Sequence, residues 1–273
     1  MTIGKNNRPV AVITGASSGF GKVFADRLAK EGNDLIILAR HEDKLNEVAA
    51  ELRTKHGVEV ETIVADLAIL DDVERVERRI KELPTLKYMI NNAGFGGNQQ
   101  FPVDDVTIET RMIQTHCIAP MRLSQAALSI MKAKGLKKGA GYVVNVASVA
   151  GFLAGVGAAD YCGTKAYLIS FSKCLQCDAY KYGVRVQALC PGFANTGFHA
   201  SETMANSHIK EAYPEIFWGN AEDIVDRSLA VLRRPFRISV VYIPKFFYKL
   251  AGYFGSSWLF APLRVLLSGG AIR

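Results

Sequence analysis

Short runs of aliphatic residues recur along the chain and alternate with longer stretches in which apolar positions follow a helical period. Most runs are rich in Val, Ile and Leu, which is typical of strands buried on both faces of a parallel sheet. The expected strands are Val10–Thr14, Leu35–Ala39, Thr62–Ala65, Tyr88–Asn91, Tyr142–Val146 and Arg185–Leu189, with a further candidate at Ile238–Ile243.

Five helices are expected between these runs, at Gly21–Lys30, Lys44–His56, Asp72–Leu83, Thr107–Lys134 and Tyr161–Tyr182. The alternation predicts an α/β protein with a single Rossmann-like, doubly wound parallel sheet and helices on both faces. It continues to about residue 245, so we expect one domain over residues 1–245. The irregular segment 193–221 is a candidate substrate lid, and residues 246–273 form a C-terminal extension.

Composition places the chain among ordinary globular proteins. It has 273 residues, 49% hydrophobic and 22% charged, which excludes a disordered chain, a coiled coil and a fibre. Five cysteines are too few for a disulfide scaffold and favour a reducing compartment. The first ten residues lack a signal-peptide core and no apolar stretch is long enough to span a membrane, so a cytoplasmic protein is expected.

The positive charge is concentrated at the C-terminus. The net charge is +7, yet residues 233–273 hold seven Lys or Arg and no Asp or Glu, so the rest of the chain is neutral. This distribution gives no reason to expect nucleic-acid binding. The same stretch is rich in aromatic residues, which suits subunit or intramolecular packing, peripheral contact with a membrane surface, or a cap over a pocket. The sequence leaves these three readings open.

A glycine-rich turn, Thr14–Gly21 (TGASSGFG), joins the first expected strand to the first helix. Glycines allow a backbone to approach a pyrophosphate closely, and a helix N-terminus supplies unpaired N–H groups for it. The alternative reading is turn chemistry alone. The candidate cofactor-binding residues here are Gly15, Ser17, Ser18, Gly19, Phe20 and Gly21.

Arg40 follows the second strand, at the place where an NAD site usually has a carboxylate for the ribose. A guanidinium pairs with a 2′-phosphate, so this residue predicts NADP as the cofactor. The alternative is a solvated Arg that opens a helix.

Two further strand ends carry candidate cofactor residues. Asp66 follows the third strand and is expected to accept a hydrogen bond from the adenine amino group, or to cap the next helix. After the fourth strand, Asn92, Ala93 and Gly94 are small enough for the backbone to lie against the cofactor.

Tyr161 and Lys165 lie four residues apart on an expected helix and therefore share one face. A nearby ammonium favours the phenolate, so Lys165 is expected to lower the pKa of Tyr161 toward the range useful for a general acid. Ser148 follows a strand at the edge where such sheets bind ligands. Taken singly, a Tyr/Lys pair at this spacing is most often a surface pair.

Together these motifs resemble the short-chain dehydrogenase/reductase family over roughly residues 8–245. The shared elements are TGASSGFG, NNAG at 91–94, Ser148, Tyr161-x-x-x-Lys165, and Pro191-Gly192 with Thr196. The resemblance implies that Tyr161 protonates a carbonyl oxygen, Lys165 holds the nicotinamide ribose and Ser148 orients the carbonyl. It also implies that Pro191, Gly192 and Thr196 fix the carboxamide end of NADP, and that the two longest expected helices form a homodimer or homotetramer.

His116 stands where many family members carry an Asn that holds a water of the proton relay. A neutral imidazole has one donor and one acceptor, so His116 is a candidate catalytic residue for the same water. The other reading is a helix His bonded to a backbone carbonyl.

Aromatic and apolar residues such as Phe193, Phe217 and Trp218 populate the segment 193–221. They favour a hydrophobic ketone, such as a 3-oxoacyl chain or a steroid-like compound, interconverted with its secondary alcohol. The alternatives are a catalytically weak NADP-binding regulator and a peripheral membrane-associated reductase of lipids.

Overall fold

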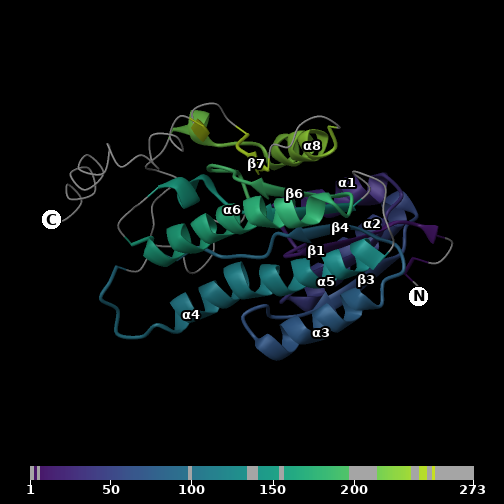
Figure 1. Ribbon diagram of the computed structural model, residues 1–273, viewed down its shortest axis with the longest axis horizontal. Coiled ribbons are helices and arrows are strands. Elements are labelled where there is room, and N and C mark those ends of the chain that lie inside the picture. The colour runs from purple at the N-terminus through teal and green to yellow at the C-terminus, as the bar shows by residue number, and fades with distance from the viewer. Residues whose placement is uncertain are drawn as a thin grey trace.

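The structure is a computed structural model that describes residues 3–4, 7–97, 100–133, 141–153, 157–196, 214–234, 240–244 and 248–249. Seven parallel strands form one sheet in the order β3-β2-β1-β4-β5-β6-β7 (Figure 1). Their bounds are β1 Val10–Thr14, β2 Asp34–Ala39, β3 Val60–Val64, β4 Leu86–Asn91, β5 Gly141–Val146, β6 Val184–Leu189 and β7 Val241–Tyr242.

Helices cover both faces of the sheet, because successive strand residues point to opposite sides. In β1, Ala11 and Ile13 join one core cluster, whereas Val10 and Val12 join the other. The first cluster is covered by α1 Gly19–Lys30, α2 Glu42–His56 and α8 Ala221–Leu232; the second by α3 Leu70–Lys81, α5 Ala119–Ala133 and α6 Ala159–Tyr180. The predicted doubly wound Rossmann-like fold is confirmed.

The helix expected over Thr107–Lys134 is present through Ala133, with a π-helical turn inside it. It consists of α4 Thr107–Ile113, a π-helical turn η2 at Gln114–Ile118, and α5; Lys134 lies outside the described residues. The wider turn buries Thr115, His116 and Cys117. Its position around His116 is relevant because π-turns inside helices are frequent at functional sites. Two short 3₁₀ turns, η3 Val149–Phe152 and η6 Glu215–Phe217, complete the described helices.

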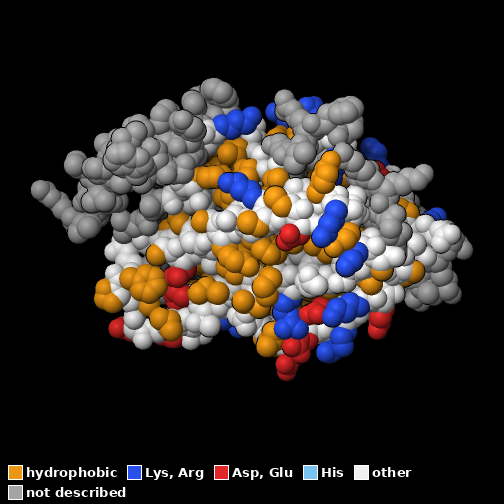
Figure 2. Space-filling model, viewed as in Figure 1, with side chains coloured by type: hydrophobic (Ala, Val, Ile, Leu, Met, Phe, Trp, Pro, Cys, Tyr) orange, Lys and Arg blue, Asp and Glu red, His pale blue; other side chains and the backbone are white. Residues whose placement is uncertain are grey.

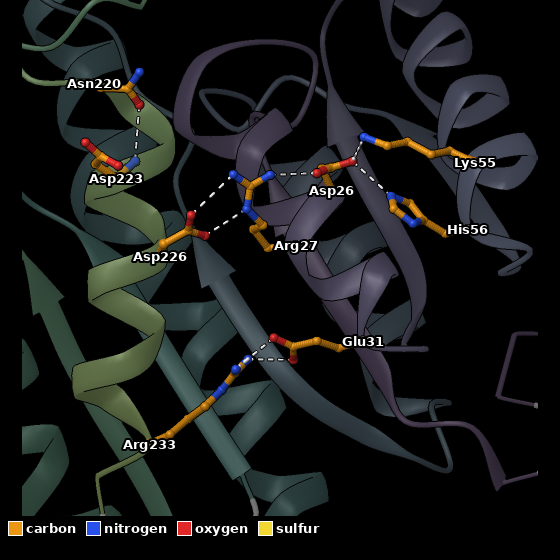
Figure 3. A network of polar contacts seen from close by, with 9 residues as sticks. All are labelled: Asp26, Arg27, Glu31, Lys55, His56, Asn220, Asp223, Asp226 and Arg233. Carbon is orange, nitrogen blue, oxygen red and sulfur yellow. Dashed lines mark hydrogen bonds and ion pairs between the residues drawn. The ribbon is translucent and has the colours of Figure 1, made fainter.

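Ion pairs join α1 to its two neighbours on the first face (Figure 3). Arg27 of α1 bonds Asp226 of α8 at 2.7 Å, and Arg233 after α8 pairs with Glu31 at 2.6 Å. On the other side, Asp26 accepts bonds from Lys55 and His56 of α2. These contacts fix the middle and the C-terminal end of α8 against the C-terminal half of α1.

Several segments expected from the sequence lie partly outside the residues that the structure describes. Residues 197–213 of the expected lid and all of 246–273 except Tyr248 and Lys249 lie there, as do 238–239 of the last expected strand. Within the described ranges, no helix combines the length and the apolar character needed to cross a membrane.

Candidate active site

The carboxyl ends of β1 and β4 are tied together by side chains of Thr14 and Asn92. Thr14 Oγ1 accepts the backbone N–H groups of Asn92 and Ala93, each at 2.9 Å. Asn92 Nδ2 donates to the carbonyls of Thr14 at 2.9 Å and Gly15 at 3.0 Å. This is the point where the strand order reverses, and open α/β sheets bind their ligands in the crevice there.

The glycine-rich turn is packed too closely for other residues. Gly15 has a φ of +66°, and a Cβ on it would lie 2.8 Å from Ala93 Cα. A Cβ on Gly21 would lie only 2.1 Å from the Gly15 carbonyl oxygen. Thr196 lies opposite, since its Cβ is 3.3 Å from where a Gly19 Cβ would be. The structure therefore brings the turn, the NNAG segment and the Pro191–Thr196 segment together.

No side chain of the N-cap residue or of the first turn caps the N-terminus of α1. Ser18, the N-cap residue, makes no side-chain capping bond, and the first turn contains no acidic residue. Unpaired amides and a positive dipole end are what an anionic pyrophosphate requires. Ser18 is exposed, whereas Ser17 and Phe20 are half-buried beside it.

Arg40 and Asp66 differ in the polar contacts that their side chains make within the protein. Arg40 is exposed directly after β2 and forms no ion pair with any residue the structure describes. Asp66 accepts the Ala68 N–H at 3.0 Å and pairs with Arg111 at 2.6 Å. The expectation that Asp66 caps the following helix is wrong, because α3 begins only at Leu70 and Asp66 instead forms a local turn.

Ser148, Tyr161 and Lys165 meet at the carboxyl ends of β5 and β6. The Ser148 hydroxyl lies close enough to the Tyr161 phenol to lower its pKa. Lys165 Nζ lies 5.6 Å from the centre of the Tyr161 ring and donates to the Val146 carbonyl at 3.1 Å. Ser148 also accepts the Ala150 N–H at 3.1 Å, which fixes its hydroxyl beyond β5.

The pKa of Tyr161 differs from the expectation. Burial raises it to about 12, and the neighbour that lowers this pKa is the Ser148 hydroxyl, not the Lys165 ammonium. Burial also lowers the pKa of Lys165 to about 8. Because burial outweighs the effect of Ser148, the Tyr161 phenol is protonated at neutral pH and is ready to donate its proton.

His116 is fully buried, and both of its ring nitrogens have protein partners. Nε2 accepts the Phe95 N–H at 3.1 Å, which leaves Nδ1 to donate to Thr164 Oγ1 at 3.0 Å. Burial, followed by the charge of Lys165, lowers the pKa of His116 well below 6.5. The ring therefore has no donor or acceptor left for a relay water, and its bonds differ from the backbone-carbonyl bond of the other reading.

Some residues of this region were not singled out from the sequence. Thr164 bridges His116 and the Tyr161 carbonyl, which it reaches at 3.0 Å. Asn145 accepts a bond from Asn91 at 2.8 Å and donates to Ser172 at 2.9 Å, all in the core beneath the site. Asn145 could have been noticed in the sequence because it is a polar residue inside the otherwise aliphatic run Tyr142–Val146. The described residues contain no group of side chains suited to hold a metal ion.

A family model described as short chain dehydrogenase matches residues 9–206. The chain belongs to the short-chain dehydrogenase family. The predicted family and the predicted enzyme class, a nicotinamide-dependent dehydrogenase/reductase of carbonyl and alcohol groups, are thereby confirmed.

Relatives within the short-chain dehydrogenases differ in what they act on. Sulfoacetaldehyde reductase 2 of Chromohalobacter salexigens is 34% identical, over 85% of this chain and 91% of its own. A short-chain dehydrogenase from Sphingobium yanoikuyae, solved with NADPH, is 31% identical with a TM-score of 0.78, covering 97% and 96%. The bulky-bulky ketone specific alcohol dehydrogenase from Comamonas testosteroni is 29% identical with a TM-score of 0.76, covering 98% and 96%.

Proposed function

We propose that the chain is an NADP(H)-dependent reductase of a hydrophobic ketone, with Ser148, Tyr161 and Lys165 as its catalytic residues. The observation that carries this proposal is that Ser148 and the Tyr161 phenol meet beside the buried ammonium of Lys165. A hydroxyl pair of this kind binds one carbonyl oxygen from two sides.

Each side chain has a distinct part in the reaction. Bound NADPH supplies a hydride to the carbonyl carbon. Tyr161 donates its phenolic proton to the carbonyl oxygen, so that the ketone becomes a secondary alcohol and a phenolate remains. Ser148 holds the same oxygen, and the Lys165 ammonium stabilises the phenolate until solvent returns the proton.

Arg40 is the basis for NADP rather than NAD. Its exposed guanidinium stands at the end of β2 without an ion pair in the described part of the chain, and it fits a ribose 2′-phosphate. The uncapped N-terminus of α1 fits the pyrophosphate, and we assign the carboxamide end to Pro191, Gly192 and Thr196 on the family resemblance. The NADPH complex of the Sphingobium relative supports this assignment.

The described ends of segment 193–221 favour an apolar substrate. The rings of Phe193 and Trp218 stack with centres 5.4 Å apart, next to Phe217. The Comamonas relative acts on bulky ketones, as its name states, whereas sulfoacetaldehyde is short and charged. We therefore place this chain with the enzymes of bulky, apolar ketones.

The substrate class is tested by NADPH oxidation with a panel of carbonyl compounds, followed at the nicotinamide absorbance. We expect the highest kcat/KM with bulky apolar ketones, and turnover about 10²–10⁴-fold lower in Tyr161→Phe. A preference for sulfoacetaldehyde or other short charged carbonyls would overturn the substrate assignment, and a fully active Tyr161→Phe would overturn the mechanism.

The face formed by α5 and α6 supports the expected homo-oligomer. Figure 2 shows hydrophobic side chains gathered over it, and Met121, Tyr167 and Tyr180 are each more than a third exposed. We propose that a second copy covers this face. Tyr167→Glu should then lower the mass measured by light scattering, whereas Val64→Glu on β3 should not.

A further inference from the structure

The C-terminal extension reaches the candidate cofactor loop through Tyr248. This residue is 9% exposed, and a Cβ on Gly192 would lie 2.0–2.5 Å from three of its ring carbons. Gly192 does not have a positive φ, so its backbone conformation is open to any residue. The tyrosine ring therefore lies directly against Gly192, and it is this ring that excludes a side chain there.

The Tyr248 hydroxyl joins two segments that are distant in the sequence. It accepts the backbone N–H of Phe193 at 3.3 Å and donates to the carbonyl of Phe217 at 2.8 Å. A phenol has a single proton, and here that proton is committed to Phe217. Phenylalanine at this position would keep the ring but lose both bonds.

The two segments also pair with each other directly. Ala194 and Gly219 form a parallel bridge, and Gly219 donates to the Phe193 carbonyl at 2.8 Å. The stacked rings of Phe193 and Trp218 lie beside this bridge. Tyr248 thus fixes the described base of segment 193–221 from the side of the extension.

The opposite side of the same loop is held by the catalytic serine region. The Pro191 carbonyl accepts the Val149 N–H at 3.0 Å and lies 3.5 Å from Ser148 Oγ. The loop Pro191–Phe193 is consequently fixed between Ser148 and Tyr248. A change at Tyr248 should be transmitted to whatever the loop binds.

We propose that Tyr248 is a positioning residue for the nicotinamide end of the cofactor, acting through Gly192 and Phe193. The inference rests on the proposed function, which places the carboxamide of NADPH against Pro191–Thr196. The beginning of the basic, aromatic extension would then take part in cofactor binding through Tyr248, independently of what the remaining residues of the extension contact.

The first test measures NADPH affinity by fluorescence titration, well below the unfolding temperature. Tyr248→Phe should bind NADPH about 2- to 10-fold more weakly, the range that corresponds to the loss of ordinary hydrogen bonds. Tyr248→Ala should be weaker still, because the ring contact with Gly192 is lost as well. Lys249→Ala, at the exposed neighbouring position, should bind like the wild type and is the matched control. Variants that lower only the melting temperature, with an unchanged Kd, would overturn the inference.

The second test combines Tyr248→Ala with Gly192→Ala. In the wild-type background Gly192→Ala must displace the tyrosine ring, so it should weaken NADPH binding. In the Tyr248→Ala background the space is open, and the same substitution should have little further effect. If Gly192→Ala lowered NADPH affinity equally in both backgrounds, the Tyr248 ring would not be what requires a glycine at position 192.

The two proposals fail in different ways. A wild-type protein that does not bind NADPH overturns the proposed function together with this inference. A wild type that binds NADPH, with Tyr248 variants of unchanged affinity, overturns the inference alone.

Discussion

The imidazole of His116 accepts the backbone N–H of Phe95 at 3.1 Å, and this bond fixes the tautomer of the ring. Nδ1 then carries the proton and donates it to Thr164 on α6. One side chain of the π-turn thereby links the loop after β4 to the helix that carries Tyr161 and Lys165. A Cβ on Gly94 would lie 2.7 Å from Nε2 of His116, so the loop passes directly over the ring.

Replacing His116 by Leu should destabilise the protein by about 1–3 kcal/mol, because the half-buried Phe95 N–H loses its acceptor. His116→Asn keeps one donor and one acceptor and should lose less. Urea unfolding of the three proteins measures the difference.

The same geometry predicts the pH dependence of the wild type. Since burial keeps the pKa of His116 well below 6.5, the pH–rate profile should show no ionisation of this residue near 6.5. An ionisation there that disappears in His116→Asn would contradict the structure and restore the relay hypothesis.

Tyr161→Phe should retain NADPH binding and reduce turnover by about 10²–10⁴-fold, the usual contribution of a general acid. Single-turnover rates measured with saturating NADPH and ketone provide the test. Tyr167→Phe removes a hydroxyl from a more exposed position of α6, and it should leave the rate unchanged. Comparable rates for the Tyr161 variant and the wild type would require a different proton donor.

Arg40→Ala should weaken NADPH binding by about 1.5–3 kcal/mol, the value of charge-assisted hydrogen bonds, and leave NADH binding unaltered. Calorimetric titration with both cofactors measures the two affinities. Arg78→Ala, an exposed arginine on α3, controls for the change in net charge. Equal affinity of the wild type for NADPH and NADH would remove the argument for NADP.

Lys165 makes the stability of the cofactor-free protein depend on pH. Its folded pKa of about 8 lies below the ordinary value of 10.5, so the unfolded chain binds more protons between these values and stability rises with pH there. Lys165→Met lacks this dependence. We expect Lys165→Met to be more stable than the wild type at pH 8. The difference between their free energies of unfolding should shrink by up to about 3 kcal/mol as the pH rises through this window.

Chemical unfolding at a series of pH values provides the measurement. Lys173→Met, which removes a charge from the exposed side of α6, is the control. A difference between the Lys165 variant and the wild type that stays constant from pH 8 upward would show that Lys165 is not held at a lowered pKa.

Local features of this protein could be predicted from the sequence. The strand β1, its glycine-rich turn and α1 are consecutive, so their order and their chemistry are visible in the single stretch from Val10 to Lys30. Tyr161 and Lys165 share a face because the helical period places residues four apart together. Even the doubly wound sheet follows from the alternation of strands and helices, since right-handed crossovers leave few other arrangements.

Burial and long-range partners were decided only by the tertiary structure. The pKa of Tyr161 depends on how much of its phenol is removed from water, which no local spacing determines. Asp66 finds Arg111, and His116 finds Phe95 and Thr164, across 21 to 48 residues of chain. Tyr248 meets Gly192, which follows the carboxyl end of β6, although the two are far apart along the chain. Such contacts arise from packing between elements, and a linear pattern contains the side chains but not the distances between them.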